Sequence, residues 1–161
     1  MSEYQLYKQQ VVDTCHSLLE RGYLKETEGN ISARISGQNT FAITPSNYDY
    51  AKMQANDICI LDFDMRRVEG EMKPSVESGM HAGVYQTRPD VHCIIHTHQP
   101  YASALALIKS PIPALFDEQV ARLGRSVDII PYAPSGTGFL KSAVKAKVKN
   151  NNNAFILQNH G

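Results

Sequence analysis

Two histidines two residues apart carry the strongest chemical signal in the sequence. They are His96 and His98, which close an apolar segment that begins near Val91. This segment predicts a strand over 91–98, and residues two apart on a strand face the same side. Their Cα atoms would then lie about 6–7 Å apart, which suits two imidazoles that bind one metal ion at about 2.1 Å each. Taken alone, such a pair is more often two ordinary surface or core histidines.

A zinc site needs a further ligand, because catalytic zinc sites commonly combine three protein ligands with an open position. His160 follows a strand expected over 154–158, and a sheet could bring the end of that strand beside His98. His16, on the first expected helix, is a weaker candidate, and His92 is interpreted as structural. Spacing alone leaves the third ligand open.

Glu77 is the best candidate for an acid–base group. A helix is expected over 75–86, which places Glu77 in the first turn and His81 on the same face four residues later. A glutamate in a first turn can simply complement the helix dipole. Beside a divalent metal, however, the same carboxylate can remove a proton from carbon while the metal takes up the enolate charge.

Three short segments contain the residue types of anion-binding turns. Glycine, hydroxyls, an amide and free N–H groups at a helix start are all groups that a phosphate oxygen can use. Each segment alone is also an ordinary loop. The segments are Glu28-Gly29-Asn30-Ile31-Ser32, Thr44-Pro45-Ser46-Asn47, and Pro74-Ser75 at the start of the expected helix.

The composition narrows the class of protein. The chain has 161 residues, of which 42% are hydrophobic, and this suits one globular domain. Its 16 basic and 16 acidic residues give no net charge, which argues against nucleic acid as a partner. No apolar run approaches the ~18 residues of a membrane span, and the polar N-terminus does not resemble a signal peptide. The three cysteines, Cys15, Cys59 and Cys93, are interpreted as buried free thiols in the reducing cytoplasm.

The elements that must position these side chains alternate between helix and strand. A helix capped by Ser2 and ended by Gly22 precedes several hairpins, and helices then alternate with strands. This order predicts an α/β or α+β layered domain, but not a doubly wound one, because the early strands form hairpins. The expected strands are 30–34, 40–44, 58–63, 67–70, 91–98, 129–132 and 154–158, and the later helices are 75–86, 100–107 and 137–149, the last capped by Thr137.

Taken together, these pieces resemble the class II aldolase/adducin-head family. Five motifs occur in the family's order over nearly the whole chain, and the ordered set is far more specific than any single motif. They are Gly29-Asn30-x-Ser32, Ile43-Thr44-Pro45-Ser46, Pro74-Ser75-x-Glu77 followed by His81, His96-x-His98, and Asn159-His160-Gly161.

The resemblance implies one zinc ion per subunit, held by His96, His98 and His160 with Glu77 as acid/base and fourth neighbour. It also implies a central, mainly antiparallel sheet with helices on both sides. Family members assemble as homotetramers with active sites between subunits, so the same is expected here. The resemblance further implies a substrate-binding set for phosphate formed by Gly29, Asn30, Thr44, Ser46 and Ser75.

The chain departs from the family pattern at three places. The family's sugar-phosphate aldolases usually have a second serine where this chain has Val76, so one phosphate-facing hydroxyl is absent. Asn47 replaces a glycine, which is tolerable because asparagine also adopts positive φ. Asp117 and Glu118 stand where the fuculose-phosphate aldolases carry a tyrosine proton donor, and either is a candidate second acid/base.

The function that these features predict is a zinc-dependent aldolase, an aldehyde-lyase that cleaves a small ketose phosphate through an enediolate. The same chemistry also serves a 4-epimerase, a dehydratase or a decarboxylase acting on sugar phosphates, and the sequence does not rank them firmly. A non-enzymatic adducin-like scaffold is the alternative of another class. Residues 1–161 are expected to form a single domain that lacks the family's C-terminal helical extension, which would otherwise pack over His160.

Overall fold

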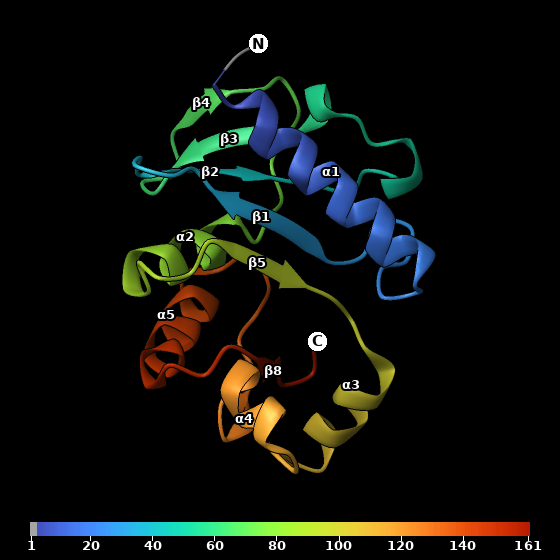
Figure 1. Ribbon diagram of the computed structural model, residues 1–161, viewed down its shortest axis with the longest axis vertical. Coiled ribbons are helices and arrows are strands. Elements are labelled where there is room, and N and C mark those ends of the chain that lie inside the picture. The colour runs from blue at the N-terminus through green and yellow to red at the C-terminus, as the bar shows by residue number, and fades with distance from the viewer. Residues whose placement is uncertain (1–2) are drawn as a thin grey trace.

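A five-stranded antiparallel sheet forms the centre of the computed structural model, which describes residues 3–161 (Figure 1). Its order is β4-β3-β2-β1-β5, so that the chain forms successive hairpins before β5 pairs with the far edge of β1. A turn at Gly37, with φ +72°, joins the first two strands. The bounds are β1 Asn30–Arg34, β2 Thr40–Ile43, β3 Cys59–Asp62, β4 Arg67–Glu69 and β5 Cys93–His96.

Helices cover both faces of this sheet, as the sequence predicts. Alternate residues of a strand face opposite sides, and here both sides are apolar. Helix α1 (Gln5–Glu20) packs one face against Ile31 and Ala33, and helix α2 (Ser78–Thr87) packs the other face against Phe41. The fold class, a layered α/β domain with a mainly antiparallel sheet, is therefore confirmed.

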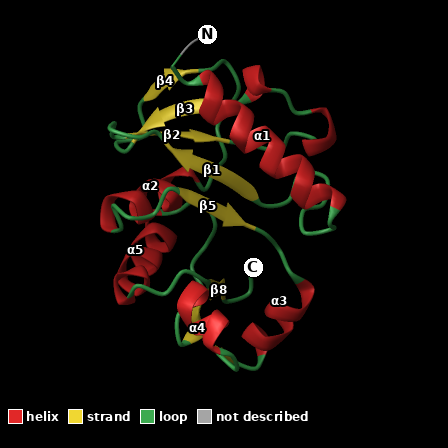
Figure 2. Cartoon of the chain, in the orientation of Figure 1, coloured by secondary structure: helices red, strands yellow, loops and turns green. Residues whose placement is uncertain are grey.

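The second part of the chain adds a smaller sheet and three more helices beneath the first (Figure 2). Helix α5 packs along α2, and together they enclose a second apolar core with Ile130 and Leu157. Strands β7 and β8 pair in parallel, and β6 pairs antiparallel with β7. The bounds are α3 Pro100–Leu107, β6 Ile112–Pro113, α4 Asp117–Leu123, β7 Ser126–Ile130, α5 Gly138–Lys147 and β8 Phe155–Leu157, with short 3-10 helices at Tyr50–Lys52, Ala55–Asp57 and Val148–Asn150.

Two predicted boundaries are wrong in ways that matter for the site. The expected strand 91–98 is shorter, because β1 begins at Asn30, which pairs with His96, and offers no partner beyond that point. The expected helix 75–86 begins only at Ser78, because Pro74 forms a bridge with Pro45 and Ser75 donates its N–H to the carbonyl of Thr44. These contacts keep the segment before Glu77 out of the helix, and Ser78 donates its N–H to the carbonyl of Ser75 to close a turn.

The structure also bears on the predicted helix caps and on the burial of the cysteines. Thr137 caps α5 as predicted, since its hydroxyl accepts the N–H of Leu140. The predicted Ser2 cap lies outside the described residues, and Tyr4 is the N-cap residue of α1. Cys93 is exposed rather than buried, because β5 is an edge strand. Among residues 3–161 the longest helix has 16 residues, and no helix combines the length and apolarity needed to cross a bilayer.

Candidate metal and acid–base site

Three imidazoles converge below the end of β5. The Nε2 atom of His96 lies 3.1 Å from Nε2 of His98 and 3.2 Å from Nε2 of His160. Two nitrogens that bind one tetrahedral zinc at about 2.1 Å each lie about 3.4 Å apart. The separations in this cluster are close to that value, so the three imidazoles can hold a metal ion of this type.

His96 is fixed by the sheet. It is the last residue of β5, it is 7% exposed, and its register partner on β1 is Asn30. The residue before that partner, Gly29, has φ +81°, and a Cβ atom there would lie 2.3 Å from the carbonyl oxygen of His96. Glycine is therefore required at this position for β1 and β5 to approach each other.

His98 and His160 both reach the cluster from irregular segments. His98 lies beyond β5, so the argument from two residues on one strand is wrong, although the two rings do meet. His160 sits in a tight turn after β8, in which Asn159 has φ +58°. At Gly161 a Cβ atom would lie 2.7 Å from the carbonyl oxygen of Thr97, so only glycine lets this turn pack against the His98 segment.

Glu77 lies directly beside the imidazoles. It is the N-cap residue of α2, not part of its first turn, and its side chain does not cap the helix. The carboxylate, 4% exposed, instead accepts hydrogen bonds from Asn30 Nδ2 and Ser135 Oγ, both at 2.8 Å. Its oxygens lie 3.3 Å from Nε2 of His96 and 3.2 Å from Nε2 of His160. Glu77 is therefore held in place as part of the cluster.

The site favours an ionised carboxylate and neutral imidazoles. Burial alone would raise the pKa of Glu77, but His96 and the donors of Asn30 and Ser135 outweigh it and lower that pKa. Burial lowers the pKa of His96 to about 4 and also lowers the pKa of His98. Near neutral pH these imidazoles thus have free lone pairs, which is the state that binds metal.

The three predicted phosphate turns lie next to one another, joined by hydrogen bonds through Thr44. The segments of Ser46 and Ser75 lie side by side, because Ser46 donates its N–H to the carbonyl of Lys73 and Ser75 donates to that of Thr44. Asn47 has φ +54°, as its replacement of glycine predicts. Within the chain Thr44 is fully buried, and its hydroxyl accepts the N–H of Ile31.

Asp117 and Glu118 are not brought to the cluster within this chain. They form the first turn of α4, where both are exposed, and no hydrogen bond or ion pair among residues 3–161 joins them to the histidines or to Glu77.

Ser135 was not identified as a site residue from the sequence. The signal for it was Pro134-Ser135-Gly136-Thr137-Gly138, a small-residue loop between a strand and a helix that lies against Glu77.

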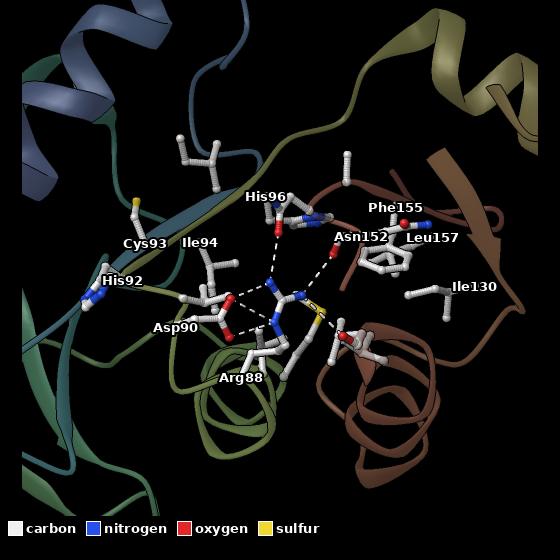
Figure 3. Close-up of a pocket in the computed structure, with 18 residues that line it drawn as sticks. Arg88, Asp90, His92, Cys93, Ile94, His96, Ile130, Asn152, Phe155 and Leu157 are labelled. Carbon is white, nitrogen blue, oxygen red and sulfur yellow. Dashed lines mark hydrogen bonds and ion pairs between the residues drawn. The ribbon is translucent and has the colours of Figure 1, made fainter. Parts of the chain in front are cut away.

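A large cavity lies next to this cluster but does not coincide with it. It has a volume of about 590 Å³ and lies between β5, α2, α5 and β8 (Figure 3). Of the cluster, only His96 lines it. The guanidinium in its wall, that of Arg88, is already bound by Asp90, at 2.6 Å, and by Asn153. The remaining walls are mostly apolar.

The chain matches known proteins over nearly its full length. A family model described as Class II Aldolase and Adducin N-terminal domain matches residues 9–161. An L-fuculose phosphate aldolase of Escherichia coli O6:H1 is 35% identical over 152 residues, which cover 94% of this chain and 69% of the relative. A 5-deoxy-D-ribulose 1-phosphate aldolase of Bacillus thuringiensis is 34% identical over 154 residues, which cover 96% and 71%.

Solved structures agree with this match. One L-fuculose 1-phosphate aldolase superposes with a TM-score of 0.89 at 37% identity, over 96% of this chain and 72% of that one. The L-fuculose-1-phosphate aldolase of Thermus thermophilus superposes with a TM-score of 0.79 at 26% identity, over 98% and 76%.

Proposed function

Since the chain belongs to the class II aldolase and adducin N-terminal domain family, we propose that it is a zinc-dependent aldolase that cleaves a small ketose phosphate. One observation carries this proposal: three imidazole nitrogens and the Glu77 carboxylate converge on one point. A non-enzymatic scaffold of the same fold would not need this arrangement.

In this proposal His96, His98 and His160 hold the metal and Glu77 moves the proton. A bound zinc ion would supply a positive charge that stabilises the enediolate. Glu77 is ionised, buried and held by Asn30 and Ser135. It is therefore ready to take a proton from the substrate carbon and to return it later.

Gly29, Asn30, Thr44, Ser46 and Ser75 form the proposed phosphate-binding set. Ser46 is only half-buried and lies beside Ser75, so this pair is the best placed to meet a phosphate. Asn30 and Thr44 already bond to protein groups, and they contribute by shaping the loops. Asp117 or Glu118 remains proposed as a second acid/base.

A homotetramer with active sites between subunits is part of the same proposal. Large apolar side chains stand exposed on and beside α3, α4 and α5, among them Tyr101 at 88% and Phe139 at 77%. Exposed apolar groups gathered in this way are typical of protein–protein interfaces. Light scattering on the purified protein measures the assembly directly. The proposed compartment is the cytoplasm, where Cys15, Cys59 and Cys93 stay free thiols.

Metal analysis of purified protein is the first experiment. The parent is expected to contain one zinc per chain, and His96→Ala or His98→Ala is expected to lose both metal and activity, since two remaining ligands hold zinc poorly. His92→Ala is the matched control, because His92 is exposed and lies outside the cluster. Stoichiometric zinc in either ligand variant would refute the ligand assignment, and a metal-free parent would favour the scaffold.

A substrate screen then separates the reactions that share this chemistry. Ketose phosphates and sugar-acid phosphates would be tested for release of an aldehyde, release of carbon dioxide, epimerisation and loss of water. Aldehyde release supports the aldolase. One of the other three products, formed without aldehyde, would assign the chain to the decarboxylases, epimerases or dehydratases of the family.

A further inference from the structure

A series of buried hydrogen bonds leads from Glu77 into the core beneath α2. Asn30 Oδ1 lies 2.6 Å from Nε2 of His81, and Nδ1 of the same ring lies 2.6 Å from Ser32 Oγ. Ser32 Oγ lies 2.7 Å from the hydroxyl of Tyr85. Ser32 and His81 are fully buried and Tyr85 is 1% exposed, so this series is closed to solvent.

The direction of every proton in the series follows from the Glu77 carboxylate and from the single proton of the His81 ring. The Glu77 carboxylate can only accept, so the amide of Asn30 donates through Nδ2 and its oxygen must accept. Nε2 of His81 therefore carries the proton, and burial lowers the pKa of His81 to about 3, so the ring has no second proton. Nδ1 then accepts from Ser32, whose oxygen accepts from Tyr85. All donors point toward Glu77.

Core packing does not require these polar groups. The surrounding layer is apolar, with Phe41 and Ala82 among its members. Polar side chains in such a layer are costly unless every group is paired. The side-chain hydrogen bonds of the series lead outward through Asn30 to Glu77, which suggests that the series is kept for what it does at Glu77.

We propose that His81, Ser32 and Tyr85 are positioning residues that fix the orientation of the Asn30 amide and, through it, the Glu77 carboxylate. If the amide turned over, its oxygen would face the carboxylate and its NH₂ would face the N–H of His81, so both contacts would be repulsive. The hydrogen bond from His81 prevents this reversal. This inference rests on the proposed function only where it concerns turnover.

The tautomer of His81 tests the direction of the series without any activity. Nitrogen NMR of the labelled protein distinguishes a ring protonated at Nε2 from one protonated at Nδ1. We expect the Nε2–H form, and we expect the Nδ1 resonance of His81 to shift in Tyr85→Phe. A ring protonated at Nδ1, or at both nitrogens, would overturn the proposal, whether or not the protein proves to be an aldolase.

Kinetics test the positioning role. We expect Tyr85→Phe to lower kcat about 3- to 10-fold, and His81→Phe to lower it about 100-fold, approaching loss of the acid–base group itself. KM should stay within about twofold and zinc content should stay at one per chain, because the histidine ligands and the Ser46–Ser75 pair proposed to meet the phosphate are unchanged. His81→Gln, which keeps an N–H donor, should recover about tenfold over His81→Phe.

Matched measurements separate positioning from damage to the fold. Tyr7→Phe removes another tyrosine hydroxyl, which accepts the N–H of Ser36 far from Glu77, and it should leave kcat unchanged. The visible spectrum of the cobalt-substituted protein should be the same in the parent and in Tyr85→Phe. Unchanged kcat in Tyr85→Phe, or a loss that tracks lost metal or lost folded protein, would overturn the positioning role. A parent without lyase activity refutes the proposed function, while the NMR result stands.

Discussion

The two parts of the chain on either side of Thr97 differ in how completely they bury their apolar side chains. Up to β5, the sheet is covered on both faces, and Ile31, Phe41 and Ile43 are completely buried. After β5, short elements leave much of their apolar surface exposed, as at Tyr101 and Phe139. Figure 2 shows that the larger sheet lies above β5 and that mostly helices lie below it.

The candidate site lies on the boundary between these parts. Glu77 and His96 come from the well-packed part, where hydrogen bonds and strand register hold them. His98 and His160 come from the other part, where they lie on irregular segments. The first part therefore supplies the acid–base group, which Ser135 of the second part also holds. The second part completes the metal site and, in our proposal, depends on contacts with other subunits.

The largest expected effect concerns the well-packed part. Glu77→Gln should keep the fold and the zinc but lower kcat about 10²- to 10⁴-fold, because an amide cannot accept the carbon-bound proton. The measurement is kcat beside zinc content. A variant within a few-fold of the parent would remove Glu77 from the mechanism, and loss of zinc would show that the carboxylate acts as a ligand first.

The free energy of unfolding of two variants, one in each part, tests the difference in packing. Ile43→Ala should lower the free energy of unfolding by about 2–5 kcal/mol, since it opens a cavity in a closed core. Phe139→Ala should change it by less than about 0.5 kcal/mol, but it should weaken the assembly. Denaturant unfolding and light scattering measure the two effects. If Phe139→Ala leaves the assembly intact, the surface around Phe139 is not an interface.

The same contrast explains what the sequence could predict. The hairpin strands were found within a residue or two because their apolar residues and turns are local features, and His160 was found because the motifs keep the family's order. Helix α4 and strand β6 were missed, since their residues are exposed and show no clear period. Ser135 was missed because its role exists only through a contact 58 residues away in sequence.

A substitution at Gly29 tests whether β5 must stay close to the start of β1 at the boundary between the two parts. Gly29→Ala combines positive φ with a Cβ atom placed 2.3 Å from the carbonyl oxygen of His96, so β5 must move. Gly37→Ala shares the positive φ, but its Cβ atom meets nothing within 4 Å, and it should cost about 1–2 kcal/mol. Gly29→Ala should cost about 1–3 kcal/mol more and weaken zinc binding in a competition assay. Equal costs and equal zinc affinity would show that β5 adapts freely.

The smallest effect is expected at Val76, where the two parts touch. Val76 is 56% exposed and lies beside Glu77, and its carbonyl oxygen would be 3.3 Å from a Cβ atom at Gly136. The resemblance places a phosphate-facing serine here, so Val76→Ser should lower KM for a phosphorylated ketose. One added hydrogen bond is worth about 1 kcal/mol, or roughly fivefold, with kcat and stability nearly unchanged. Val76→Ala is the control, because it removes the branched side chain without adding a hydroxyl. If alanine lowers KM as much as serine, bulk rather than hydrogen bonding limits binding, and the phosphate anchor lies at Ser46 and Ser75 alone.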